Sequence, residues 1–155
     1  MIIDADLSLC LVTTTAGVIS IGPQAETSVA QHISDNVVDL TKWPRNIIDQ
    51  LYWVFQIGVA ITGASAKFRI QLVTSAAVGL GTNQVLWDSG ELANATIVAW
   101  VANQTIYAFK LSAYLQHRYL GCTYEIITSA FSTGSWRSFF CVDAPYYIAP
   151  TPHSA

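Results

Sequence analysis

Four carboxylates are the first candidates for chemistry in this sequence: Asp88, Glu91, Glu125 and Asp143. Glycoside hydrolysis needs two carboxyl groups, one acting as the acid and the other as the base or nucleophile, and β-sandwich proteins sometimes carry such a pair. Asp88, however, is followed by Ser and Gly, which is ordinary turn chemistry. Glu125 has the position of a solvated residue on a strand face. A carbohydrate-binding or carbohydrate-active module therefore remains the alternative function.

The histidines and cysteines are weaker candidates for chemistry than the carboxylates. They are His32, His117, His153, Cys10, Cys122 and Cys141. No two of them have the spacing of metal ligands, and the sequence has no nucleophile elbow, phosphate loop or dinucleotide fingerprint. Cys122 and Cys141 stand within apolar runs, where a buried thiol acts as a small hydrophobe. We therefore expect no catalytic, cofactor-binding or metal site, and no enzymatic activity.

The composition is unusually poor in charge. Hydrophobic residues make up 52% of the 155 residues and charged residues only 11%, whereas about a quarter of a typical domain is charged. The net charge is −3. Because charge is what normally keeps proteins apart, a neutral and apolar-rich surface favours association. We expect a protein that is part of a larger assembly, and a soluble monomer with a Ser- and Thr-rich surface is the alternative.

Several classes of protein are excluded by the same numbers. The apolar content is too high for disorder, and heptads of Glu and Lys are missing, so the chain is not a coiled coil. The seven Lys and Arg residues are scattered singly, which does not suit a nucleic-acid partner. No apolar run is long enough to span a membrane, and the acids Asp4 and Asp6 do not suit a signal peptide. We expect neither nucleic acid nor membrane as a partner.

Alternation with a period of two recurs along the chain and predicts an all-β, antiparallel β-sandwich of jelly-roll-like type. In residues 66–74, Phe68, Ile70 and Leu72 share one face, and Arg69 and Gln71 lie on the other. The predicted strands are residues 17–21, 36–40, 51–61, 66–74, 83–89, 96–101, 105–111, 118–129 and 136–142. Turns rich in Gly, Ser, Asn and Pro separate them.

Connections between these strands can also be predicted. A short glycine turn joins 51–61 to 66–74, which favours a hairpin, and 96–101 with 105–111 is a second hairpin candidate. The outer face of 51–61 is only weakly polar, so we expect something to cover it. Pro44 suits a first helical position, which predicts a helical turn near residues 43–46. Residues 10–35 are weakly patterned and are interpreted as a long excursion with one added hairpin.

The last twelve residues differ from the rest of the chain. Residues 144–155 contain three of the five prolines, and proline cannot donate to a sheet ladder. We therefore divide the chain into a sandwich domain, 1–143, and an extended C-terminal arm, 144–155. Tyr146, Tyr147 and Ile148 would be wasted on a free tail, because Tyr gives a large contact area with a polar end. The arm is interpreted as a strap, onto either a neighbouring subunit or its own domain.

An ordered set of motifs resembles the small capsid cement, or decoration, proteins of short-tailed bacteriophages. The set consists of the start Met1–Leu7, Asn36-Val-Val-Asp-Leu40, the segment 51–64, Phe68-Arg-Ile-Gln-Leu-Val-Thr74, Leu86-Trp-Asp-Ser-Gly90, Ile106-Tyr-Ala-Phe-Lys-Leu111 and Arg118-Tyr-Leu-Gly-Cys-Thr-Tyr124. Each motif is weak alone, and their order and spacing cover residues 1–143. The chain departs from the family in a longer segment 10–35 and in the Pro-rich arm.

The resemblance implies a homo-oligomer, a dimer or a trimer, on the outer surface of the virion. It would bind the assembled head by bridging subunits of the major capsid protein. We expect apolar contacts with a neutral rim. The candidate contact residues are Ile2, Ile3, Trp43, Arg45, Tyr146, Tyr147 and Ile148. Trp43 stands beside Pro44 where a loop tip is expected, and its alternative role is a lid over the core.

Overall fold

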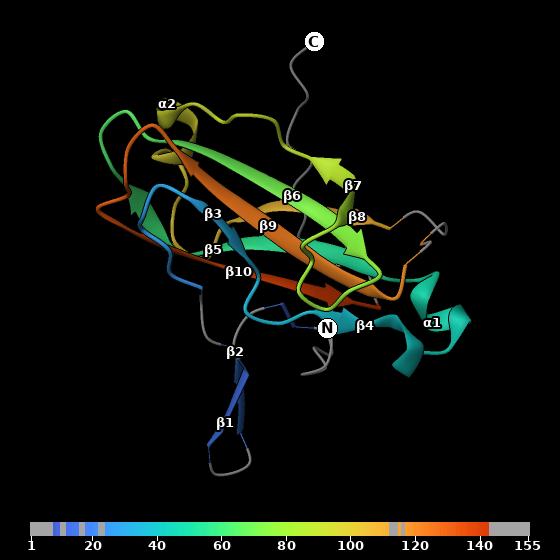
Figure 1. Ribbon diagram of the computed structural model, residues 1–155. Coiled ribbons are helices and arrows are strands. Elements are labelled where there is room, and N and C mark those ends of the chain that lie inside the picture. The colour runs from blue at the N-terminus through green and yellow to red at the C-terminus, as the bar shows by residue number, and fades with distance from the viewer. Residues whose placement is uncertain are drawn as a thin grey trace.

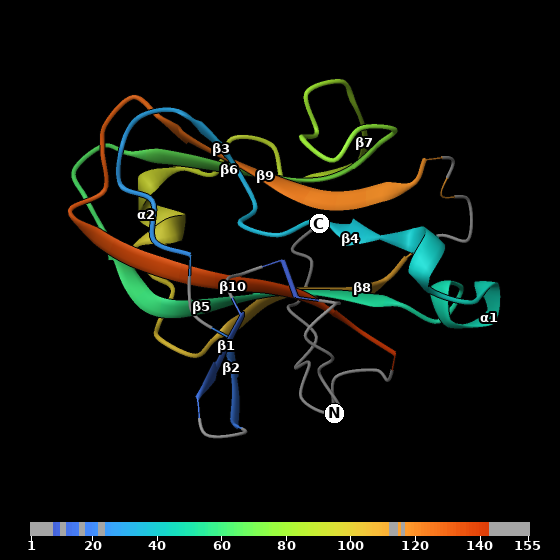
Figure 2. The same ribbon diagram turned by 60° about the horizontal axis from the view of Figure 1, so that its bottom comes forward.

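The computed structural model describes residues 8–9, 12–15, 18–21, 24–111, 115 and 117–142 of the chain, and of 12–15 and 18–21 it describes the backbone alone. Figure 1 shows an arrangement dominated by antiparallel strands, and Figure 2 shows that the longest of them form two layers. The all-β, antiparallel sandwich expected from the sequence is confirmed. The finer jelly-roll assignment stays a prediction.

One layer is a three-stranded sheet in the order β10-β5-β8. Its strands are β5 (Tyr52–Thr62), β8 (Thr105–Lys110) and β10 (Thr133–Cys141). Both pairings are antiparallel, with Val54 opposite Phe139 on one side and Ala108 on the other. Isolated bridges from Ser8 and Gln24 occupy the outer edge of β10, which protects that edge from pairing with another chain.

The other layer is a five-stranded sheet in the order β3-β9-β6-β7, with β4 also paired to β9. Its strands are β3 (Gln31–Ile33), β4 (Val38–Asp39), β6 (Lys67–Ser75), β7 (Asn83–Asp88) and β9 (Tyr119–Ile127). The long pair β6 and β9 runs in unbroken register from Lys67 opposite Ile127 to Ser75 opposite Tyr119. This pair forms the central ladder of the layer.

The core fills the space between the two layers. The expected face of β6 is confirmed, because Phe68, Ile70 and Leu72 are fully buried. From the opposite sheet, the ring of Phe55 lies 6.4 Å from that of Phe68. The other large, fully buried side chains include Trp53, Trp136, Tyr124 and Phe140. Aromatic rings that tilt against one another in this way bury large apolar areas and add specific ring–ring attraction.

The hairpin predicted between residues 51–61 and 66–74 is wrong. β5 pairs with β10 and β8, and β6 pairs with β9 and β7, so the short turn between them carries the chain from one sheet to the other. Both strands have an apolar face, and facing each other across the core buries both faces. A hairpin would have placed the two faces side by side in one sheet. Ser65, with φ of 62°, takes the left-handed conformation that tightens this crossover.

The strand predicted at residues 96–101 is also wrong. The chain forms the short helix α2 (Asn94–Ile97) there, followed by a turn that leads into β8. The buried side chains of this stretch are Ile97 and Trp100, three residues apart, which is a helical and not a strand spacing. The hairpin candidate around residues 102–104 therefore has only its second strand.

The remaining connections follow the sequence more closely. An added hairpin, β1 (Val12–Thr15) with β2 (Val18–Ile21), lies in the segment 10–35 as expected. The helical turn near Pro44 is α1 (Arg45–Ile48), with Pro44 at its N-cap. The predicted strand at 36–40 shrinks to β4, because a 3₁₀ turn over Leu40–Lys42 follows at once. No described helix has the length and apolar character needed to cross a bilayer.

Candidate functional site

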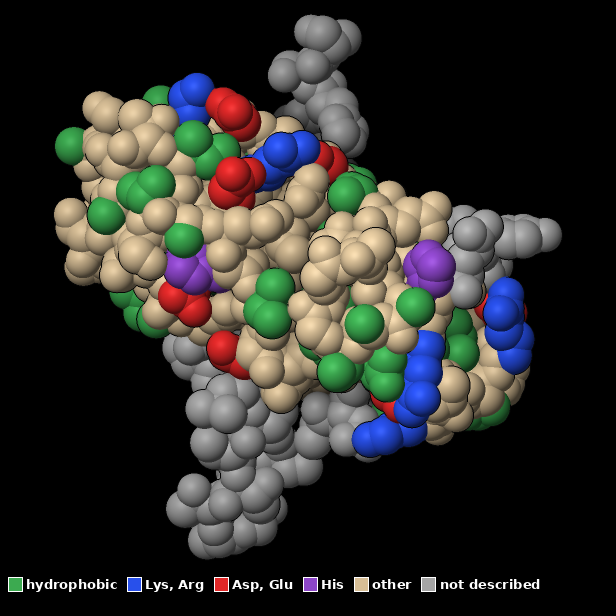
Figure 3. All heavy atoms as spheres, in the orientation of Figure 1, with side chains coloured by type: hydrophobic (Ala, Val, Ile, Leu, Met, Phe, Trp, Pro, Cys, Tyr) green, Lys and Arg blue, Asp and Glu red, His purple; other side chains and the backbone are tan. Residues whose placement is uncertain are grey.

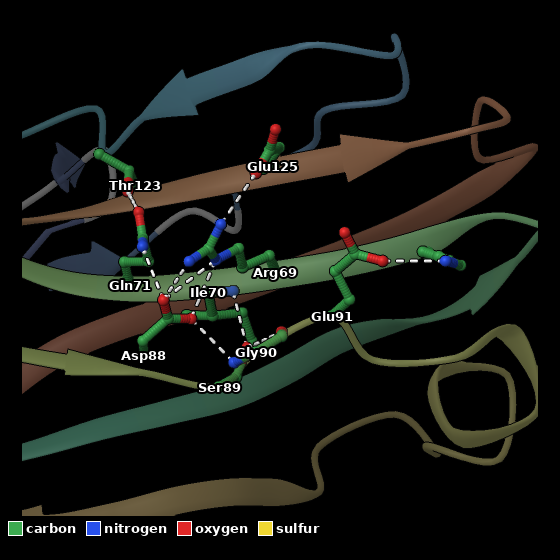
Figure 4. Close-up of polar contacts among 10 residues, drawn as sticks. Arg69, Ile70, Gln71, Asp88, Ser89, Gly90, Glu91, Thr123 and Glu125 are labelled. Atoms are coloured by element: carbon green, nitrogen blue, oxygen red, sulfur yellow. Dashed lines mark hydrogen bonds and ion pairs between the residues drawn. The ribbon is translucent and has the colours of Figure 1, made fainter.

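Arg69, near the start of β6, holds a polar cluster on the outer face of the five-stranded sheet (Figure 4). Its Nε donates hydrogen bonds of 3.0 and 3.1 Å to the two carboxylate oxygens of Asp88, and its second terminal nitrogen also binds Asp88. Glu125, directly opposite Arg69 on β9, lies 3.9 Å from the other terminal nitrogen. One cation on β6 therefore ties together carboxylates from both neighbouring strands.

Neighbouring groups complete the coordination of Asp88. Gln71 donates to the carboxylate at 2.9 Å, and the backbone N–H of Gly90 donates at 2.8 Å. Thr123 in turn donates to the amide oxygen of Gln71 at 3.2 Å. The register explains this arrangement, because Gln71 stands directly opposite Asp88 on β7 and Thr123 on β9. The cluster joins three strands by side-chain contacts in addition to the ladder.

The electrostatics of Asp88 and Glu91 do not suit acid catalysis. The hydrogen bonds from Arg69, and then those from Gln71 and Gly90, hold the pKa of Asp88 well below its ordinary value. The pKa of Glu91 is lowered by its 2.9 Å ion pair with Lys67. A glycosidase acid needs the opposite shift, a raised pKa that keeps its proton at neutral pH. Of the four carboxylates considered from the sequence, Asp143 lies outside the described residues.

A metal-binding site would be a further candidate in the described part of the chain. No group of three or more His, Cys, Asp or Glu residues there is placed to hold a metal ion. His32 pairs with Glu26 at 3.2 Å and also contacts Ser28. Cys122 and Cys141 are both buried.

A second polar group lies near α1. Arg118 binds the carboxylate of Asp39 through two nitrogens, at 3.0 and 2.6 Å, and its guanidinium lies 5.0 Å from the ring centre of Tyr119. Arg118 is the main cause of a strongly lowered pKa at Asp39. Asp39 also caps the 3₁₀ turn by accepting from the backbone N–H of Thr41. This ion pair fixes the chain just before the expected contact loop.

The contact residues Trp43 and Arg45 are placed differently from one another. Trp43 is partly buried and packs against the main core, so its apolar body acts as a lid, the alternative role considered for it. Arg45 is exposed and forms an ion pair with Asp49 at 3.2 Å, one helical turn later. Only Arg45 of these two presents most of its side chain to solvent. Ile2, Ile3, Tyr146, Tyr147 and Ile148 lie outside the described residues.

An exposed apolar group that sequence reasoning missed lies near α2. Val59, Val98 and Val101 are 53%, 42% and 62% exposed. The turn before β8 is bonded to β5, because Ile57 exchanges backbone hydrogen bonds with Asn103 and Gln104. Val101 and Val59 each stand two residues from this junction in their own segments. We call Val59, Val98 and Val101 the valine group. The strand wrongly assigned to 96–101 concealed it, since a strand would have buried one of Val98 and Val101.

The visible surface in Figure 3 has few charged side chains, and they gather mainly in groups amid neutral and apolar ones. Among the described residues, four of the seven Lys and Arg side chains form an ion pair with a described acid: Arg45, Lys67, Arg69 and Arg118. Neutralised pairs project little field beyond about a Debye length, roughly 8–10 Å. The electrostatic field around the surface is therefore weaker than the low charge content alone would indicate.

A shallow apolar pocket lies where the edge strands β7 and β8 approach each other. It encloses about 190 Å³ and is lined by Leu72, Leu86, Trp87, Phe109, Lys110, Leu111 and Leu115. Lys110 stands opposite Tyr52, so its side chain belongs to the outer face of the three-stranded sheet and not to the space between the layers. Lys110 is the one charged residue among the described residues that line the pocket.

Comparison with known proteins places the chain in a family. No curated protein matches its sequence. The model of the family described as Bbp16 matches residues 22–140. That match spans well over half of the chain and runs from just before β3 almost to the end of β10, so this chain is a member of the Bbp16 family.

Proposed function

We propose that this protein is a capsid cement protein. It binds the outer surface of an assembled bacteriophage head and stabilises the head by bridging subunits of the major capsid protein. The ordered motifs that resemble cement proteins support the proposal, and the sandwich agrees with the fold that this resemblance implies. In this role the protein works as a homo-oligomer and catalyses nothing.

The observation that carries the proposal is the valine group, on a surface where four of the seven Lys and Arg residues are paired with acids. Large exposed apolar side chains in contact with water are characteristic of interaction sites when they gather in one place. Burying apolar surface contributes about 25 cal/mol of favourable free energy per Å², so such a group is a source of affinity. Ion pairs elsewhere on the surface, such as Lys67–Glu91, leave little net field to repel a partner.

Mass action then converts binding into stability of the shell. A protein that binds the assembled lattice but not free subunits stabilises the lattice by its own binding free energy. Each contact can be modest, because many copies bind at equivalent positions. An oligomer that reaches two capsid subunits at once gains further from the high effective concentration of the second site.

The test is co-sedimentation with assembled heads that lack this protein, compared with unassembled major capsid subunits. We expect the protein to pellet with heads and to leave free subunits alone, and we expect decorated heads to resist heating better. The double variant Val59→Ser/Val101→Ser should bind more weakly, by roughly tenfold for the loss of one to two kcal/mol of apolar contact.

Val78→Ser is the matched control, because Val78 is 61% exposed, as Val101 is, but belongs to the loop between β6 and β7. It should bind heads like the unaltered protein. The proposal fails if the unaltered protein stays in the supernatant with heads. A shift of its melting temperature by glycans under the same conditions would instead favour a carbohydrate-binding module.

A further inference from the structure

The outer face of the three-stranded sheet carries a second apolar cluster that is separate from the core. Val54, Phe139 and Cys141 form it, with Tyr52 and Ala108 packed against them. The register places Phe139, Val54 and Ala108 side by side across the three strands. Because Trp53 and Phe55 point into the core, their neighbours at even positions point to the opposite face.

This outer cluster is buried. The exposed fractions are 2% for Val54, 4% for Phe139 and zero for Cys141. In Figure 2 the β1–β2 hairpin is drawn on this side of β5 and β10, and it runs away from the sandwich there as it does in Figure 1. Side chains this dry on an outer face need a cover. The described hydrophobic residues that pack against them, Tyr52 and Ala108, belong to the same sheet.

Arg137, on the same face, has a buried donor that needs a hydrogen-bond acceptor. It lies two residues before Phe139 on β10, opposite Gln56. Its Nε is buried and has no hydrogen-bond partner among the described residues. An unsatisfied buried donor is destabilising, so the cover should bring an acceptor with it. A tyrosine hydroxyl beside apolar surface meets both requirements.

We propose that the C-terminal arm of the same chain, residues 144–155, covers this face, with Tyr146, Tyr147 and Ile148 seated on Val54 and Phe139. The arm begins just beyond Val142, at the end of the strand that carries half of the cluster. Crossing from β10 to β8 takes about 10 Å, two strand spacings. Three or four extended residues span that distance, so the apolar triplet is correctly placed along the arm.

The N-terminal side of the chain is the less suitable cover. Ser8 and Leu9 lie in the plane of the sheet, where Ser8 bridges to Phe139 and Leu9 N–H donates to the Ser138 carbonyl. These two residues extend the sheet sideways at the edge of β10. The arm's prolines prevent it from adding a further strand, but a strap that crosses a face needs no ladder bonds.

The two buried thiols report on this proposal independently of each other. Cys141 lies on the outer cluster, and Cys122 lies in the main core between the layers. Two reporter chains, Cys10→Ala/Cys122→Ala and Cys10→Ala/Cys141→Ala, leave one of these thiols each. Their rates of reaction with a thiol reagent are measured under native conditions, with and without Tyr146→Ser/Tyr147→Ser/Ile148→Ser in the full-length chain.

We expect the triple substitution to speed labelling of Cys141 by at least about tenfold, because local opening of the strap then costs less. Labelling of Cys122 should not change. Thr151→Ala/His153→Ala/Ser154→Ala, in the same arm, is the control and should leave both rates unaltered. The Cys141 rate of the unsubstituted arm should not depend on protein concentration.

Three outcomes overturn the proposal. An unchanged Cys141 rate would show that something other than the arm covers the cluster. Equal acceleration of both thiols would show that the arm is part of the cooperative core and not a strap. Loss of Cys141 protection on dilution of the protein with its arm intact would assign the cover to a second copy.

Discussion

Leu80 lies directly over Gly121, and the two positions fit only because Gly121 has no side chain. Leu80, in the loop between β6 and β7, is 2% exposed although it stands on the outer side of the sheet. A Cβ added at Gly121 would lie 2.5 Å from Leu80 Cδ1 and 3.2 Å from Ser34 Oγ. Leu80 itself has φ of 53°, a left-handed conformation that is costly for leucine. The contact between Leu80 and Gly121 thus fixes the loop against the sheet.

Gly121→Ala should therefore destabilise the protein by about 1–3 kcal/mol, the usual cost of overpacking. The added Cβ would also press on Ser34, whose hydroxyl accepts from the Cys122 N–H at 3.2 Å. Chemical denaturation measures this cost. Adding Leu80→Ala to Gly121→Ala should recover part of it, because the two residues are in contact and their effects are not additive.

Gly81→Ala is the matched control for this prediction. A Cβ at Gly81 meets nothing within 4 Å, so the change should be neutral or slightly stabilising, by up to about 1 kcal/mol, through the unfolded state. Equal costs at Gly121 and Gly81 would refute the anchoring role of Leu80.

Ser138→Ala should also destabilise the protein, although alanine is the more apolar residue. The Trp53 Nε1–H donates to Ser138 Oγ at 2.7 Å in the core, where both residues are fully buried. Removing the hydroxyl leaves the indole N–H buried without that acceptor, which costs about 1–3 kcal/mol. Denaturation of Ser138→Ala measures the cost, and the exposed Ser132→Ala serves as control. A neutral Ser138→Ala would mean that a water or another group replaces the hydroxyl.

The faces of single strands could be predicted from the sequence, because the period of two is a local property. Phe68 and Ile70 alternate with Arg69 and Gln71, and burial of only one face makes that pattern visible. Sheet partners are not local. β5 and β6 are neighbours in the chain, yet each finds its partners far away, as in the pairing of Trp53 with Phe140. A short turn is compatible with either a hairpin or a crossover.

Only part of the polar cluster could be predicted from the sequence. Arg69 and Gln71 could be placed on the outward face of their strand, and Asp88 on the next one, but Asp88 was interpreted from its Ser-Gly neighbours as turn chemistry. The turn is real, since the Gly90 N–H donates to Asp88. The ion pair with Arg69, nineteen residues earlier in the chain, depends on the register of β6 and β7, which includes a shift between Leu72 and Val73.

The Arg69–Asp88 pair should make stability fall in acid. Arg69 lowers the pKa of Asp88 in the folded state, so the folded protein holds this proton less tightly than the unfolded chain does. Stability from the pair is fully present above the unfolded pKa of about 4 and is lost as the pH falls below it. Denaturation between neutral pH and about pH 2 should show Asp88→Asn losing less stability on acidification than the unaltered protein. Asp49→Asn, which removes the partner of Arg45, is the surface control, and an equal or larger effect there would contradict the assignment to Asp88.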